Sequence, residues 1–327
     1  MQQLFRRIQS AVLALISTLV LSAPLAAQTT TEHSIEEIVV SAKRQGPPLW
    51  KVSNGGNSIW LFGILSPHPI INNWDSESVR LIISESDVYI EPQTIKIRER
   101  NPFKLPGLIR KLNRFKEIPN NGTLEDVLPT QLYSRFLAAK ELYAPNDRNL
   151  LNLRPMFAAE ELYRAALLTK GLLMNDHMEN DLGRMAKRNG VEISPIVLRA
   201  TGNQLSDLLE NADPPPNLAC LETTLDSIET DLDEIINRAE HWRNGDASGF
   251  TQLDYPDVAG SCALSYIARD EFPLSEWEDT QSLWFEKVEE ALVQNRQSFG
   301  SLPIRELVHP DGLLARLLAK GYSVQIL

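Results

Sequence analysis

The sequence predicts an α/β fold in which a central β-sheet is formed from N- and C-terminal strands, with a large, mostly helical middle and second half. Three observations predict it. Strand-like segments lie at 49–53, 58–65 and 87–91, and another closes the chain. After residue 129, apolar residues recur mostly three or four positions apart, which is the spacing of one helix face. The 327 residues are 43% hydrophobic and 23% charged, which is ordinary for a folded protein.

Residues 1–27 have the three parts of a secretory signal peptide. Arg6 and Arg7 precede an apolar run over residues 11–21, and small residues follow at 23–27. The apolar run is too short to span a bilayer core of about 30 Å, so cleavage after it would leave no transmembrane span. The sequence therefore predicts a secreted, periplasmic protein. A buried N-terminal helix is the alternative interpretation.

Residues 28–47 are polar apart from the island Ile38-Val39-Val40, which predicts a flexible linker. Within it, Glu36–Arg44 (EEIVVSAKR) resembles the short segment that TonB-dependent outer-membrane receptors offer to TonB by strand addition. This resemblance implies TonB as a partner and a role as an accessory of TonB-linked outer-membrane uptake. A tether that docks on nothing is the alternative. The folded domain is expected over 48–327.

The first part of that domain alternates between strand and helix signals. The segments 49–53 and 58–65 flank Asn54-Gly55-Gly56-Asn57, whose residues tolerate positive φ, and they predict a β-hairpin. A helix is expected over 76–86 and a strand over 87–91. Residues 100–128 are rich in Pro, Asn and Gly without a clear period, and we expect a loop with short helical pieces there.

The rest of the chain is dominated by helical patterns. Helices are expected over 129–143, 154–168, 178–190, 201–211 and around Trp277 to Leu292, with a strand at 191–198. After the proline run 214–216, seven apolar residues recur at helical spacing and predict one long helix: Leu218, Leu221, Leu225, Ile228, Leu232, Ile235 and Ala239. Residues 309–327 predict a capped helix, a glycine turn and a final strand.

Charge and cysteine content exclude several functions. The net charge is −11, and basic residues do not interleave with aromatic residues as they do in a nucleic-acid-binding surface. We therefore do not expect nucleic acid as a partner. The chain contains no phosphate-cradling glycine loop and no His-Glu-x-x-His motif. Cys220 and Cys262 are the only cysteines, and in an oxidising compartment they are expected to form a disulfide. Two buried free thiols are the alternative.

Five short motifs together resemble one known family. They are LWKV at 49–52, LFG at 61–63, Leu307-Val308, DGLL at 311–314 and Gly321-Tyr322. Their order and spacing are similar to secreted members of the TraB/GumN family, and the resemblance covers about residues 48–327. It implies an α/β fold in which the first and last motifs meet in one cleft. In the animal branch of the family it also implies metal-dependent peptidase activity.

The chain departs from the family pattern at the residues that carry this chemistry. Ser66 stands where the first motif has histidine, and Glu306 stands where the closing motif has histidine. An acidic residue common in the family is kept as Glu91. The Arg-Asn-Arg run of the penultimate helix is replaced by Thr280-Gln281-Ser282, and the glutamate after a middle strand is replaced by Arg199.

A hydrolytic metal site needs about three protein ligands around an open position. Serine is a poor ligand, and two carboxylates alone form a weak all-oxygen site. We therefore expect a catalytically degenerate domain that binds a ligand, peptide or protein partner in the ancestral cleft, with no cofactor. Its candidate site residues are Ser66, Glu91 and Glu306.

Two alternatives retain an enzymatic activity. His68 and His309 lie close to the substituted positions, so that His68, Glu91, Glu306 and His309 could form a rebuilt site for Mn, Co or Zn in a peptidase or other hydrolase. Alternatively, Ser66 could act as a nucleophile, although the Gly-x-Ser-x-Gly turn that exposes such serines is absent.

Overall fold

The structure is a computed structural model that describes residues 36–37, 46–70, 76–174, 177–211, 218–250 and 274–327. Its strands are β1 (Glu36–Glu37), β2 (Leu49–Asn54), β3 (Asn57–Ile64), β4 (His68–Pro69), β5 (Val88–Arg98), β6 (Leu172–Leu173), β7 (Glu192–Thr201), β8 (Gln297–Pro303) and β9 (Ser323–Ile326). The predicted signal peptide and most of the predicted TonB-like segment lie outside the described residues.

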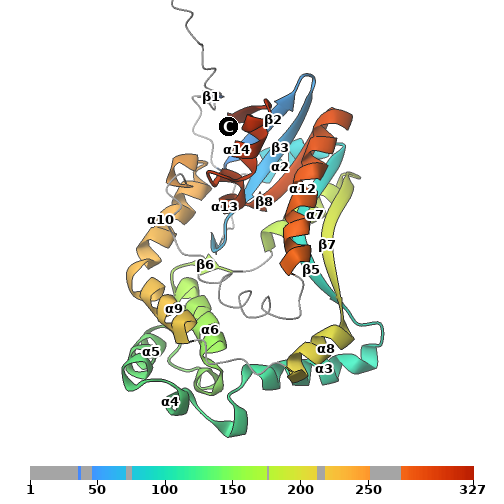
Figure 1. Cartoon of the computed structure of the whole chain (residues 1–327). Helices are drawn as coiled ribbons and strands as arrows, with labels where there is room; N and C mark the ends of the chain where they lie inside the picture. Colours follow the sequence, from blue (N-terminus) through green and yellow to red (C-terminus); the bar gives the residue numbers. More distant parts are fainter. Residues whose placement is uncertain (1–35, 38–45, 71–75, 175–176, 212–217, 251–273) are drawn as a thin grey trace, which may run out of the picture. The chain divides into compact units, whose positions relative to one another are not determined.

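The helices follow the predicted order closely (Figure 1). They are α2 (Ser76–Ser84), α3 (Leu105–Lys116), α4 (Leu124–Val127), α5 (Thr130–Tyr143), α6 (Pro155–Thr169), α7 (His177–Arg188), α8 (Gly202–Asn211), α9 (Leu218–Thr230), α10 (Leu232–Arg243), α12 (Leu274–Gln294), α13 (Ile304–Val308) and α14 (Leu313–Ala319). Among the described residues, no helix combines the length and apolar character needed to cross a membrane.

The described strands form a mixed seven-stranded sheet in the order β1-β9-β2-β3-β8-β5-β7. β3, β8, β5 and β7 are parallel to one another, and the β2–β3 hairpin brings in an antiparallel strand. Gly55 in the hairpin turn has φ +60°, as the predicted turn requires. This sheet confirms the predicted α/β class, because N-terminal β2 and β3 lie beside C-terminal β9 and β8.

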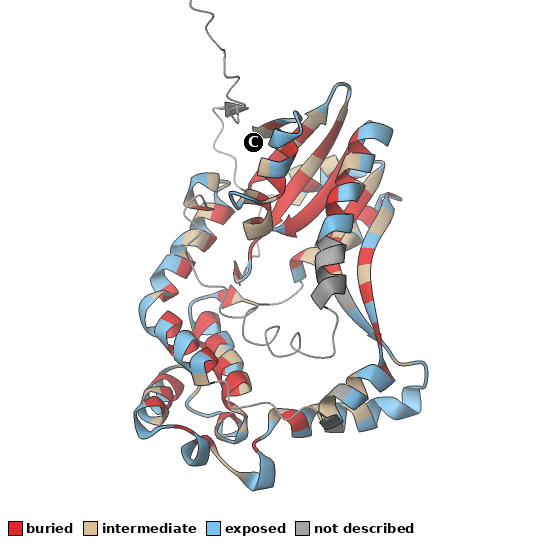
Figure 2. Ribbon diagram, in the orientation of Figure 1, coloured by how far each residue is buried: buried red, intermediate tan, exposed pale blue. Residues whose placement is uncertain are grey.

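Helices cover both faces of the sheet. In Figure 1, α12 lies in front of the strands and α2 lies behind them. The helix α12 contacts β3, β5, β7 and β8, whereas α7 contacts α2, β5 and β7. Figure 2 shows that the central strands are almost entirely buried. The core therefore lies on both faces of the sheet. At the C-terminal edge of the parallel strands, α13 begins directly after β8.

The sequence analysis missed the central strand β8, which lies between β3 and β5. Its sequence, QSFGSLP, contains serine, glycine and proline, which are weak strand formers. The small residues fit this position because a Cβ on Gly300 would already lie 3.3 Å from Trp284 of α12. The buried Ser301 hydroxyl has a partner, since the Tyr89 hydroxyl lies 2.8 Å away.

Two helix predictions were also wrong. Residues 100–128, expected as a loop with short helical pieces, do include the short helix α4 but also contain the twelve-residue helix α3, whose Pro106 and Gly107 hid the helical signal. Proline is tolerated there because the first helical turn needs no N–H donors. The expected long helix after 218 is divided at Asp231 into α9 and α10. At the break, the Thr230 hydroxyl donates to the Asp226 carbonyl at 2.8 Å, which competes with the regular helix pattern.

The apolar stripe predicted for this segment is nevertheless buried continuously across the break. Its buried members are Leu221, Leu225, Ile228, Leu232, Ile235 and Ala239. In addition, Glu36 and Glu37, which the sequence analysis placed in the linker, pair with Gln325 and Ile326 of β9. Cys220 is buried in α9, and its predicted partner Cys262 lies outside the described residues, so the disulfide remains a prediction.

We predict that Tyr89→Phe will change how stability depends on pH. Burial raises the pKa of the Tyr89 phenol above its usual value, while an unfolded tyrosine ionises near pH 10. Tyr89 therefore adds stability that is complete below about pH 10 and is lost as pH rises further. At pH 7, Tyr89→Phe should lower the free energy of unfolding by about 1 kcal/mol through loss of the Ser301 bond.

Urea unfolding of Tyr89→Phe at pH 7 and pH 11 tests this prediction. The deficit relative to the parent protein should shrink or change sign at pH 11, because the variant has no phenol to ionise. Ser301→Ala is the matched control, since it removes the same hydrogen bond and keeps the phenol. An equal deficit for Tyr89→Phe at both pH values would contradict the prediction.

Candidate functional site

The candidate site lies where β3 and β8 end at the same edge of the sheet. Ile64 and Pro303 are paired at the ends of these parallel strands. Ser66 follows the first strand, and Glu306 lies in α13, which begins directly after the second. In open α/β sheets, ligands bind at the carboxyl ends of the strands. The two substituted motif positions therefore lie at the same edge of the sheet.

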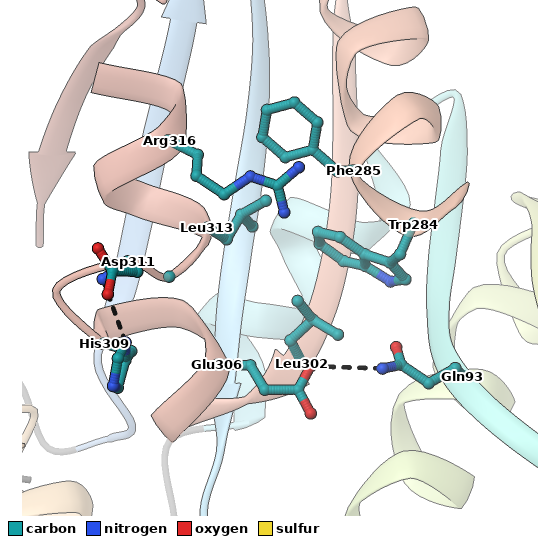
Figure 3. A pocket seen from close by; sticks show the side chains of 10 residues that line it. Gln93, Trp284, Phe285, Leu302, Glu306, His309, Asp311, Leu313 and Arg316 are labelled. Carbon is teal, nitrogen blue, oxygen red and sulfur yellow. Dashed lines mark hydrogen bonds between the residues drawn. The ribbon is translucent and has the colours of Figure 1, made fainter. Parts of the chain in front are cut away.

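A pocket of about 200 Å³ opens beside Glu306 (Figure 3). Its walls are apolar and aromatic on one side and polar on the other. The lining residues are Gln93, Trp284, Phe285, Leu302, Glu306, His309, Asp311, Gly312, Leu313 and Arg316. Both signs of charge are present, which suits a polar ligand better than a purely apolar one.

A β-bulge in β5 brings Gln93 into this pocket. Pairing between β5 and β7 shifts by one residue between Ile90 and Gln93. Such a bulge changes the face to which the following side chains point. Glu91 lies within the shifted stretch, and its carboxylate oxygen is 3.4 Å from where a Cβ on Gly183 of α7 would lie. Glu91 is therefore next to α7 and is not a pocket residue, whereas Gln93 is.

Gln93 and Glu306 form the polar centre of the pocket. The amide nitrogen Nε2 of Gln93 donates to Glu306 Oε2 at 3.4 Å (Figure 3). Only 9% of Gln93 is exposed, and its carbonyl oxygen Oε1 is buried without a hydrogen-bond partner among the described residues. The Glu306 carboxylate fixes the orientation of the Gln93 amide. A carboxylate accepts hydrogen bonds, so it attracts the amide nitrogen and would repel the amide oxygen.

His309 is held at the rim by the loop that follows α13. Its Nδ1 accepts the backbone N–H of Asp311 at 3.1 Å. In the neutral ring the proton is therefore on Nε2, which makes that nitrogen a donor and not a metal ligand. The Gly312 N–H donates to the His309 carbonyl at 2.7 Å, so the loop is closed by backbone bonds.

Arg316 and the aromatic residues of α12 form the opposite wall. The Arg316 guanidinium lies 3.8 Å from the centre of the Phe285 ring, a cation–π arrangement. It forms no salt bridge with any residue in the described part of the chain. The Trp284 indole N–H donates to the Glu91 carbonyl at 3.0 Å, which fixes the ring against the sheet. Within the described ranges, the Arg316 guanidinium therefore has no carboxylate partner.

The remaining predicted site residues lie outside this pocket. Ser66 is exposed beyond β3. His68 is buried in β4, where its Nδ1 donates to the Pro69 carbonyl at 2.9 Å, and β4 pairs with β6. Arg199 is exposed in β7, and Ser282 is exposed on α12. The pocket therefore contains Glu306 and His309 of the predicted set but not Ser66, His68 or Glu91.

Among the described residues, no group of three or more His, Cys, Asp or Glu side chains is placed to share a metal ion. Sequence reasoning missed Gln93 and Arg316 as site residues. The predicted strand 87–91 was ended one residue before Pro92, whereas β5 continues to Arg98; Pro92 was a usable signal for Gln93, because proline within a strand often marks a bulge. Arg316 lies on α14, two residues after the DGLL motif, and carried no comparable signal.

Comparison with protein families agrees with this architecture. A model of the TraB/PrgY/gumN family matches residues 48–326. The chain therefore belongs to this family. No curated protein and no solved structure gives a significant match.

Proposed function

We propose that this protein is an exported, catalytically degenerate TraB/PrgY/gumN domain that binds a small polar ligand in the pocket beside Glu306. The ligand class we favour carries a hydrogen-bond donor and an anionic group, as the end of a peptide does. The observation that carries the proposal is the buried carbonyl oxygen of Gln93, which lacks a donor in a pocket that also presents Arg316.

An unpaired buried oxygen is costly and therefore informative. Leaving a buried acceptor without a partner costs about 1–3 kcal/mol. A ligand N–H or O–H that enters between Trp284 and Glu306 would remove this cost. The Arg316 guanidinium offers planar donors to a carboxylate or a similar anion. A pocket of about 200 Å³ limits the bound group to a small molecule or one end of a peptide.

The contacts of the polar residues support loss of the metal chemistry. Glu306 accepts the Gln93 amide, and His309 accepts a backbone N–H at Nδ1. In a metal-binding histidine, the ring nitrogen that does not bind the metal usually donates its N–H to an acceptor. In His309 the Nδ1 nitrogen instead accepts a hydrogen bond. Export to the periplasm and the Cys220–Cys262 disulfide belong to the same proposal and rest on the sequence.

A thermal-shift screen with free amino acids, dipeptides and small dicarboxylates tests ligand binding. A ligand at one hundred times its Kd stabilises the folded state by about 2.7 kcal/mol. For a domain of this size each kcal/mol raises Tm by about 2–4 °C, so a clear upward shift is expected. The variant Arg316→Met should abolish the shift for anionic ligands.

Gln93→Met separates a binding role from a structural role. Because Met leaves no unpaired oxygen, we expect unchanged or higher stability of the free protein together with weaker ligand binding. Leu142→Ala, on the exposed face of α5, is the control and should change neither. A large loss of stability with unaltered ligand binding would show that Gln93 has only a packing role.

The rival function, a metal-dependent peptidase or other hydrolase, is tested on the same protein. Metal content is measured after purification, and peptide cleavage is assayed with Mn²⁺, Co²⁺ or Zn²⁺ and with EDTA. We expect no stoichiometric metal and no cleavage. Metal-dependent cleavage that is lost in Glu91→Ala would overturn the degenerate assignment.

A further inference from the structure

The segment 96–116 concentrates positive charge in an acidic protein. It contains eight Lys and Arg residues and one acidic residue, Glu99, in a chain whose net charge is −11. The segment covers the end of β5 and the whole of α3. Attraction to a large anionic surface needs a local concentration of positive charge such as this one, because the chain as a whole carries net negative charge.

One side of α3 is fixed to the rest of the domain. Phe115 is buried and packs edge-on against Phe157 of α6, with ring centres 5.8 Å apart. Lys111 forms a salt bridge with Glu210 of α8, and its Nζ donates to the Ser206 hydroxyl at 2.7 Å. Figure 1 shows α3 and α8 side by side. These contacts leave the rest of α3 facing outward, and Figure 2 shows it largely exposed.

The outward residues include four arginines that lack salt bridges. Arg98, Arg100, Arg110 and Arg114 are exposed, and none forms a salt bridge with a residue in the described ranges. A surface arginine that only improves solubility also needs no salt bridge. The lack of salt bridges alone therefore does not identify a binding partner. The arginines do, however, place four exposed guanidinium groups within residues 98–114.

Large apolar side chains are exposed among these arginines. Phe103 is 90% exposed, Ile109 is 58% exposed and Leu105 is 43% exposed. We use the name basic α3 surface for these three residues and the four arginines Arg98, Arg100, Arg110 and Arg114. Exposed aromatic and aliphatic residues next to cations are typical of helices that lie in a membrane interface.

We propose that the basic α3 surface docks the protein on a bilayer that contains anionic phospholipids. The arginines bind lipid phosphates, and Phe103, Leu105 and Ile109 enter the boundary between headgroups and acyl chains. The apolar residues favour a bilayer over a soluble polyanion, because burial of apolar surface stabilises only the membrane-bound state. The helix lies on the membrane and does not span it, since α3 has only twelve residues.

Vesicle co-sedimentation tests the proposal with the protein from Gln28 onward, which retains every described residue. The probes are vesicles of phosphatidylcholine mixed with phosphatidylglycerol, vesicles of phosphatidylcholine alone, and soluble heparin. We expect binding to the anionic vesicles that weakens with added salt, and little binding to neutral vesicles. No binding to anionic vesicles at low salt would overturn the proposal.

Paired variants separate the two contributions. Each cation near an anionic surface contributes about fivefold in binding, so Arg110→Gln with Arg114→Gln should weaken vesicle binding by about 25-fold. Phe103→Ser with Ile109→Ser should weaken vesicle binding while leaving heparin binding unchanged. Vesicle binding that persists undiminished in the apolar variant would show a general polyanion site and overturn membrane docking.

Matched controls place the same changes elsewhere on the surface. Arg148 and Lys170 are exposed cations outside the basic α3 surface, and Leu142 is an exposed leucine on α5. Arg148→Gln with Lys170→Gln, and Leu142→Ser, should retain vesicle binding. Thermal unfolding of every variant confirms that it is folded. If the control variants lost vesicle binding to the same extent, binding would depend on total charge or hydrophobicity. That result would contradict a specific docking surface.

Discussion

Trp242→Ala is expected to lower the free energy of unfolding by about 3–5 kcal/mol, the range for truncating a large buried aromatic residue. Trp242 is fully buried in α10 and packs edge-on against Phe62, with ring centres 6.1 Å apart. Its indole N–H donates to the carbonyl of Gly63 at 2.7 Å. The substitution therefore removes both a packing contact and a hydrogen bond that attach α10 to the end of β3.

Trp242→Phe isolates the hydrogen bond. It keeps an aromatic ring but leaves the Gly63 carbonyl without the indole donor, which should cost about 1–2 kcal/mol. Trp60→Phe is the matched control, because the Trp60 indole nitrogen is buried without a partner in the described part of the chain. Guanidinium unfolding monitored by circular dichroism measures both. An equal loss in the two Trp→Phe variants would show that the Gly63 bond contributes nothing.

The Trp242 contact shows what the sequence did and did not reveal about the LFG motif. The strand that carries the motif could be predicted, but its packing partner could not. The motif correctly located β3 and its hairpin, since turn residues and apolar runs are local signals. Which distant residue would contact Gly63 could not be inferred, because Trp242 is separated from it by most of the chain. The predicted apolar stripe ended at Ala239 and did not include Trp242, and packing between distant segments has no local signature.

In the candidate site, too, local signals could be predicted from the sequence, whereas contacts between distant segments could not. The first and last motifs end at the same edge of the sheet, where Ile64 pairs with Pro303, but only the closing motif lines the pocket, through Glu306 and His309. The strand β8, which was not predicted, decides which residues lie next to the end of β3. Because β8 pairs with β3, the helix α13 that follows β8 begins beside the end of β3. The bulge before Gln93 then separated Glu91 from the pocket. One extra residue in a strand reverses the face of every following side chain, so motif spacing alone could not assign these roles.

The loss of motif histidines also has a physical counterpart in the pocket. Glu306 accepts a hydrogen bond from the Gln93 amide nitrogen at 3.4 Å. His309 accepts a backbone N–H, which commits its other ring nitrogen to donation. Both arrangements favour binding of a polar ligand. The position of each group depends on the tight loop between α13 and α14.

Gly312→Ala is expected to disturb this loop and weaken ligand binding by at least about tenfold, with a loss of about 1–3 kcal/mol in stability. A Cβ at Gly312 would lie 2.6 Å from the carbonyl oxygen of Glu306 and 2.9 Å from that of His309. Both are backbone atoms, so the clash cannot be relieved by rotating a side chain. The loop must shift, and Glu306 and His309 move with it.

Gly107→Ala is the matched control. Gly107 lies in α3 with nothing within 4 Å of a Cβ, so alanine should stabilise the helix by about 0.5–1 kcal/mol and leave pocket binding unaltered. Urea unfolding and titration with the best ligand from the thermal-shift screen measure both effects. If Gly312→Ala bound that ligand as tightly as the parent protein, the α13–α14 loop could not be what positions the site, because its backbone cannot accommodate the added methyl group without moving.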